Sequence, residues 1–153
     1  MTTIVDVAAY ILRRYGSMTT MKLQKLAYYS QAEALSRRGT PLFDEDFQAW
    51  RGGPVCYDLF LQHRGRFIVD AADLEGNSPH DLSSEDATLV DRVCDGLSSC
   101  TGNQLSERTH GEDPWRRMRE GLAPSDQGSR IISKDAIRRF YRANPVFGSA
   151  ACS

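Results

Sequence analysis

The segment "LSERTHGEDPWRR" (Leu105–Arg117) holds the residues of this chain whose types and spacing come closest to an active site. Ser106 and His110 stand four positions apart, so on a helix they would share a face, with Asp113 within reach of the histidine. Glu107 and His110 have the i,i+3 spacing that di-iron helical bundles use for metal ligands. The segment therefore raises two chemical hypotheses, a hydrolase and a metal site.

Neither hypothesis finds the additional residues that its chemistry requires. A di-iron site needs a second Glu-x-x-His motif, and the chain has neither that nor the H-E-x-x-H motif of zinc proteases. A serine nucleophile needs a strained, exposed turn beside oxyanion donors, and G-x-S-x-G is absent. We therefore predict no metal, no cofactor and no catalytic residue, and expect that the protein is not an enzyme. A hydrolase that uses His110 and Asp113 remains an alternative hypothesis.

The same segment contains the residues expected at a corner between two helices. Gly111 is a helix-ending residue, Asp113 is a good N-cap, and Pro114 suits the first helical position. Trp115 then falls in the first turn of the next helix, and His110 can hydrogen-bond a carbonyl or an acid across the corner. We favour this structural interpretation over catalysis.

Two other groups of residues are candidates for binding. In "RGGPV", the residues Gly52-Gly53-Pro54 follow a predicted strand. A glycine pair there can hold an anion at a helix N-terminus, but a tight turn is its commoner role and the P-loop motif is absent. Lys22, Lys25 and Tyr29 share the polar edge of a predicted central helix, where they either face a partner or are solvated.

Hydrophobic periodicity predicts a mainly α (α+β) fold, a compact single-domain bundle of about six helices with a small inserted β-strand or hairpin. Strand period appears at Phe47–Arg51, and Phe67–Val69 is expected to pair with it. We place the domain at residues 1–144 and expect residues 145–153 to form a disordered tail. From cap and stop residues, helices are expected over 2–16, 19–39, 54–63, 83–99, 101–109 and 133–142, with the corner helix starting near 113.

The amino-acid composition limits the classes of function that this protein can have. The chain has 153 residues, with 19 Lys and Arg against 20 Asp and Glu, a net charge of -1. This balance is typical of a soluble globular domain and argues against a dedicated nucleic-acid-binding protein, which usually has a basic excess. No apolar run approaches the roughly 20 residues that span a bilayer, and no secretory signal opens the chain. We therefore expect a cytoplasmic protein without a membrane partner.

Three segments, in this order, resemble the signatures of the Panacea domain family, which was earlier catalogued as a domain of unknown function. The family includes phage-associated proteins and the SocA-type antitoxins of toxin–antitoxin systems in prokaryotes. The similarity runs from about Val5 to Tyr141, and "IISKDAIRRFY" resembles the closing segment of the family. The three segments are "KLQKLAYYSQ" (Lys22–Gln31), "FQAWRGGPVCYDLF" (Phe47–Phe60) and "LSERTHGEDPWRR".

The resemblance implies an antitoxin that neutralises a cognate protein toxin by direct protein–protein binding. It also implies an alternative, since SocA-type members act as adaptors that deliver a toxin to the ClpXP protease. Some members carry an extra N-terminal DNA-binding domain, which we do not expect here because Val5 already starts the core.

The family signature supplies no catalytic residues to transfer. Its matching residues are expected to hold the fold, and they are Gly53, Pro54, His110, Asp113, Pro114 and Trp115. Aromatic and charged residues, arginine above all, are frequent at the centres of interfaces. The candidates for partner binding are Lys22, Lys25, Tyr29, Trp50 and Arg51.

Overall fold

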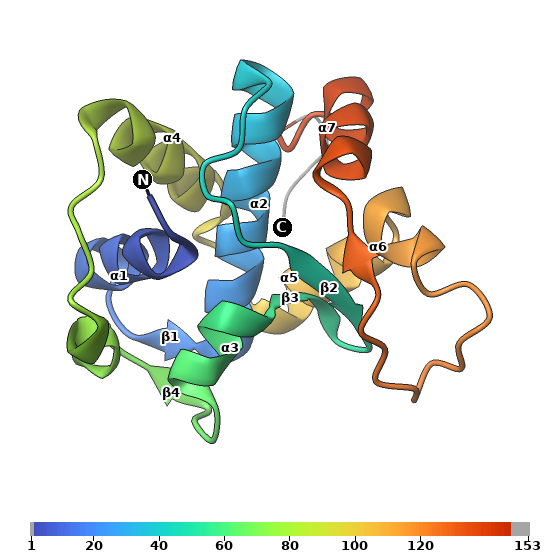
Figure 1. Ribbon diagram of the computed structural model, residues 1–153, viewed down its shortest axis with the longest axis horizontal. Coiled ribbons are helices and arrows are strands. Elements are labelled where there is room, and N and C mark those ends of the chain that lie inside the picture. The colour runs from blue at the N-terminus through green and yellow to red at the C-terminus, as the bar shows by residue number, and fades with distance from the viewer. Residues whose placement is uncertain (1, 148–153) are drawn as a thin grey trace.

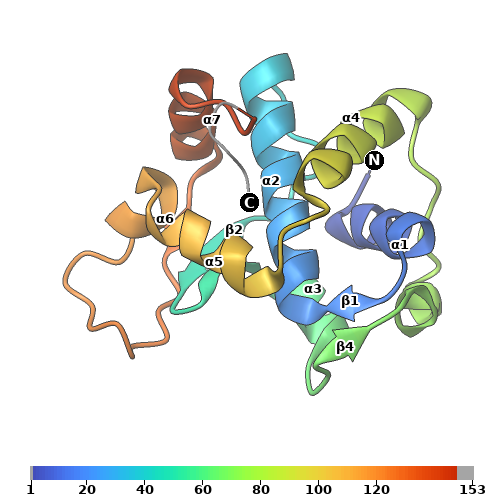
Figure 2. The ribbon, with the colours of Figure 1, turned by 180° about the vertical axis from the view of Figure 1, so that it is seen from behind.

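The computed structural model describes residues 2–147 and places one helix, α2 (Thr20–Arg38), at the centre of the molecule. Every residue from Leu23 to Leu35 is buried. The prediction of a central helix with neighbours on more than one side is therefore confirmed. The helices that pack against α2 in Figure 1 and Figure 2 are α1 (Ile4–Tyr15), α4 (Ser84–Leu97), α5 (Gly102–His110) and α7 (Lys134–Ala143).

These helices begin where the sequence offers a side chain to cap them. An N-cap oxygen accepts a hydrogen bond from a backbone N–H of the first turn, a contribution of about 1 kcal/mol. Gly16 and Gly39 follow α1 and α2 with φ of 85° and 78°, a backbone region that glycine tolerates well. The capping residues are Thr3 for α1, Thr19 for α2, Ser83 for α4, Thr101 for α5 and Ser133 for α7.

Two small antiparallel sheets complete the fold. The first pairs β1 (Met18–Thr19) with β4 (Ile68–Val69). The second has the order β3-β2-β5, formed by β3 (Gly53–Cys56), β2 (Phe47–Trp50) and β5 (Ile131–Ile132). The expectation that Phe67–Val69 pairs with the strand at residue 47 is therefore wrong, because β3 and β5 occupy both edges of β2.

The chain reverses direction at Arg51 and Gly52, so β2 and β3 form a hairpin in which Trp50 lies opposite Gly53. A helix was expected to start at Pro54, but this residue belongs to β3, and the helix α3 (Tyr57–His63) starts three residues later. Pro54 has no N–H to donate and lies on an edge strand, where proline is tolerated.

The mainly α, α+β fold class is confirmed. The described residues form eight helices, including the short α6 (Asp113–Arg117) and a 3-10 helix, η1 (Ala71–Asn77), in a segment expected to be a loop. None of these helices combines the length and apolarity that a bilayer crossing requires. Of the predicted tail, Val146 is buried in the core, and residues 148–153 lie outside the described part of the chain.

Candidate functional site

Side chains from three helices hydrogen-bond to alternate carbonyl groups of the β2–β3 hairpin. Each donor comes from a different helix, namely α2, α5 and α6, so the hairpin is held from inside along its whole turn. The pairs are Lys25 Nζ to Pro54 O (3.1 Å), Ser106 Oγ to Gly52 O, and Trp115 Nε1 to Trp50 O (2.7 Å). We call these six residues the hairpin cluster. All three segments that carry the family resemblance meet in it.

Lys25 is the most unusual member of the hairpin cluster because its amine is buried in the interior, at 1% exposure. Burial disfavours the charged amine and lowers the pKa of Lys25 to about 7. Gly53 makes room for it, since a Cβ atom on Gly53 would lie 2.5 Å from Lys25 Cε. The φ of Gly53, 118°, also belongs to a region that other residues rarely adopt. The glycine of the "GGP" segment therefore has a structural role.

A second polar contact holds the end of the hairpin against α2. Gln24 accepts a hydrogen bond from the backbone N–H of Cys56 (2.9 Å) and donates one to its carbonyl (3.2 Å). The same amide lies 3.0 Å from Nε2 of His63, which is buried on α3. Burial lowers the pKa of His63, which favours the neutral ring. Sequence reasoning did not single out Gln24 or His63, because their partners lie more than 30 residues away.

The corner between α5 and α6 is confirmed, with a different arrangement of its polar residues. His110 stacks on Trp115, with ring centroids 4.0 Å apart and planes at 10°, whereas its buried Nε2 has no hydrogen-bond partner. Burial lowers the pKa of His110, and the charges of Lys25 and Arg119 lower it further. The N-cap position falls on Glu112 instead of Asp113, so Asp113 is the first helical residue.

The side chain of Glu112 connects this corner to two helices of the core, α2 and α7. Its carboxylate accepts hydrogen bonds from the hydroxyls of Tyr29 on α2 (2.6 Å) and Tyr141 on α7 (2.8 Å). Arg108 forms an ion pair with its other oxygen at 3.3 Å and lies over the Tyr29 ring. The prediction that Lys25 and Tyr29 lie on an exposed edge is therefore wrong, because both side chains have interior partners and are buried.

The structure does not bring the residues of the hydrolase hypothesis together. Asp113 forms ion pairs with Arg116 and Arg117, and the His110 ring stacks on Trp115. The Ser106 hydroxyl donates its hydrogen bond to the Gly52 carbonyl. Within residues 2–147, no three His, Cys, Asp or Glu side chains are grouped as metal ligands would be.

A pocket of about 300 Å³ opens between the start of α2, the hairpin and α3, and Lys25, Trp50 and Gly52 of the hairpin cluster contribute to its lining. Trp50 and Phe60 stand edge to face in its wall, with centroids 4.9 Å apart. Arg51 also lines this pocket and is exposed. Three of the five predicted partner-binding residues, Lys25, Trp50 and Arg51, therefore line this pocket, although Lys25 itself is buried.

Lys22 is half-buried, and its amine donates to the carbonyl of Ser98 at 3.2 Å. This contact directs it toward the end of α4, so it does not line the pocket. The structure thus places Trp50, Arg51 and the buried Lys25 at the pocket, Tyr29 in the interior and Lys22 beside α4.

Large apolar side chains are exposed around this pocket. Phe67 is 76% exposed and Leu61 is 45% exposed, while Tyr57 stacks on Phe60 with centroids 5.9 Å apart. Tyr57, Phe60 and Leu61 lie on α3 and Phe67 directly precedes β4, and Figure 1 and Figure 2 show α3 and β4 close to the start of α2. We define the aromatic face as Met21, Trp50, Tyr57, Phe60, Leu61, Phe67 and Ile68.

The three segments that resemble the signatures of one family thus meet at one hairpin, which packs on the central helix α2. The family description "Antitoxin SocA-like, Panacea domain" matches residues 23–116, and the chain belongs to this family. The match begins in α2 and ends in α6, so it contains the hairpin cluster.

One curated relative is Antitoxin SocA of Caulobacter vibrioides (strain NA1000 / CB15N). The two chains are 27% identical over 137 residues, which cover 80% of this chain and 72% of the relative. No solved structure matches the chain. The recognition of the family from the three segments is therefore confirmed.

We predict that Gly53→Ala destabilises the protein by about 3–5 kcal/mol, because it combines backbone strain with overpacking against Lys25. Gly65→Ala is the matched control: Gly65 also has a positive φ, 86°, but a Cβ there meets nothing within 4 Å. It should cost only about 1 kcal/mol. Denaturant unfolding measures the free energy of unfolding of both variants. Equal losses of stability would contradict the role given to the close approach of Gly53 and Lys25.

We predict that the free energy of unfolding rises with pH above pH 7 in the wild type, relative to a Lys25→Met variant. Between the folded pKa of about 7 and the ordinary value of 10.5, the unfolded chain holds a proton on Lys25 that the folded protein has lost. The difference should therefore grow by up to about 1.4 kcal/mol per pH unit in that range and stay level below it. If the free energies of unfolding of the wild type and the variant change in parallel from pH 6 to pH 10, the Lys25 amine stays charged in the folded protein.

We predict that His110→Gln lowers the melting temperature, because it removes the ring stack with Trp115. A stacked pair contributes about 0.5–1.5 kcal/mol, which for a domain of this size corresponds to a few degrees, roughly 2–5 °C. Thermal unfolding followed by circular dichroism measures the shift. An unchanged melting temperature together with the loss of a hydrolytic activity would instead support the hydrolase hypothesis.

Proposed function

We propose that this protein is an antitoxin that neutralises a cognate protein toxin by direct binding, and that the aromatic face contacts the toxin. The first part is supported by membership of the antitoxin family. The second part is supported by one observation, the exposed apolar side chains that surround the pocket beside the hairpin cluster. The proposed site of action is the cytoplasm.

The aromatic face has the properties of a binding surface. Exposed apolar side chains that adjoin one another are uncommon on monomeric proteins and mark interaction sites. Tryptophan, tyrosine and arginine contribute most of the energy at interfaces, and here Trp50, Arg51 and Tyr57 stand within or beside one pocket. The hairpin that carries Trp50 is fixed from inside by three helices, so little side-chain or backbone freedom is lost on binding.

The two alternative hypotheses, an adaptor for ClpXP and a hydrolase, receive less support. Neither the family description nor the relative's name points to ClpXP, so directed proteolysis is not proposed here. Family membership favours a role without catalysis, and we propose binding as the activity of this site.

We predict that Leu61→Glu weakens toxin binding by about 10- to 100-fold, because it buries an unpaired charge in an apolar interface. Leu61 is exposed on α3, so the substitution should change the unfolding free energy by no more than about 0.5 kcal/mol. The partner to use is the product of the adjacent open reading frame. Titration calorimetry measures the affinity, and rescue of growth on co-expression measures neutralisation.

The matched control is Thr88→Glu, which adds the same charge to an exposed position of α4, at the other end of the molecule in Figure 1. It should leave the affinity unchanged. A neighbouring product that is harmless or fails to bind would overturn the antitoxin proposal, whereas full affinity of Leu61→Glu would overturn only the choice of surface. Toxin abundance, compared in cells with and without ClpXP, separates masking from directed proteolysis.

A further inference from the structure

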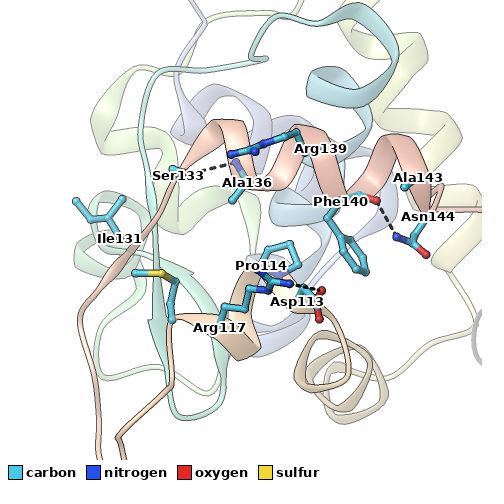
Figure 3. A pocket seen from close by; sticks show the side chains of 11 residues that line it. Asp113, Pro114, Arg117, Ile131, Ser133, Ala136, Arg139, Phe140, Ala143 and Asn144 are labelled. Carbon is cyan, nitrogen blue, oxygen red and sulfur yellow. Dashed lines mark hydrogen bonds and ion pairs between the residues drawn. The ribbon is translucent and has the colours of Figure 1, made fainter.

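A second cavity, of about 530 Å³, lies between α6 and α7 and is separate from the aromatic face. Figure 3 shows the Phe140 ring directed from α7 toward Pro114 on α6. Ile131, at the edge of the β3-β2-β5 sheet, closes one end and is 53% exposed. The apolar side chains that line this groove are Pro114, Met118, Ile131, Ala136, Phe140 and Ala143. Its floor can therefore receive aliphatic or aromatic side chains.

The mouth of the groove is basic. Arg117 on α6 and Arg139 on α7 line it with side chains 73% and 74% exposed. Within each helix one acid is shared by two arginines, and one of these acids, Asp113, also lines the groove. Asp113 pairs with Arg116 and Arg117, and Asp135 pairs with Arg138 and Arg139. One positive charge therefore remains uncompensated on each side of the groove.

The surrounding segment has the same sign of charge. Residues 113–144 contain eight Lys and Arg against four Asp and Glu, whereas the other residues contain eleven against sixteen. The near-neutral total of the chain thus hides a basic region around an apolar groove. A ligand that matches both properties has apolar side chains flanked by carboxylates.

We propose that the α6–α7 groove binds an acidic segment of the partner protein, with one or two apolar side chains in the groove and Asp or Glu residues facing Arg117 and Arg139. This inference rests on the proposed function, because the partner is the toxin, and it adds the chemistry of the toxin segment. An acidic peptide fits better than a nucleic acid, because the lining offers one aromatic ring and otherwise aliphatic groups, with no set of faces on which bases could stack.

The test uses fluorescent fifteen-residue peptides that tile the product of the adjacent open reading frame, titrated with the full chain. We expect that peptides with apolar residues flanked by Asp or Glu bind, and that the others do not. Arg117→Gln combined with Arg139→Gln should weaken binding at least 10-fold and remove most of its dependence on salt. Ala136→Trp, which fills the groove, should abolish peptide binding, whereas Leu61→Glu on the aromatic face should leave peptide binding unchanged.

Two control variants separate charge from position. Arg117→Lys with Arg139→Lys keeps both charges and should retain most of the affinity, although lysine loses the two-point contact of arginine. Arg13→Gln with Arg14→Gln removes the same charge from α1 and should have no effect. Circular dichroism confirms that each variant is folded.

Each remaining outcome decides between the proposals. If the full-length partner binds and Leu61→Glu weakens it, while no peptide responds to the groove variants, the groove inference is overturned and the proposed function stands. If the partner does not bind at all, both are overturned. Binding of a twenty-nucleotide single-stranded RNA that competes with the peptides, and that Ala136→Trp leaves intact, would falsify the choice of a protein segment.

Discussion

The buried contact between Lys25 and the Gly53-Pro54 segment is the constraint on which the rest of the structure depends. An amine in the interior loses hydration, and here the Pro54 carbonyl is the hydrogen-bond acceptor that partly compensates for that loss. The contact fixes the hairpin on α2, which leaves the carbonyls of Trp50 and Gly52 facing the α5–α6 corner. The corner, in turn, positions Glu112 between the tyrosines of α2 and α7. Polar interactions thus connect α2 to the β2–β3 hairpin, to the α5–α6 corner and, through Glu112, to α7.

The sequence predicts those features of the fold that local rules determine. Caps such as Thr101 and Ser133, the glycine that ends α2, and the corner at Gly111 all depend on neighbours within a few residues. The position of Lys25 could not be predicted in the same way. A lysine on the polar edge of a predicted helix is expected to be solvated or to face a partner unless its acceptor is known, and Pro54 lies 29 residues away.

The candidate site was predictable only in part for a related reason. Trp50 and Arg51 were chosen by residue type and reach the pocket, whereas Tyr29, chosen by the same rule, is held inside by Glu112. Phe67 and Leu61 carry no motif, and only the tertiary arrangement reveals that their side chains are exposed. The residues that resemble the family signature mostly support the hairpin from within.

The uneven distribution of charge has a consequence for the approach of a partner. A basic α6–α7 region joined to an acidic remainder gives the molecule a permanent electric dipole, although its net charge is only -1. Such a dipole rotates a diffusing protein before contact, so that an acidic partner meets the α6–α7 side more often than chance allows. The rate of association would then depend on ionic strength, although the small net charge alone predicts little such dependence.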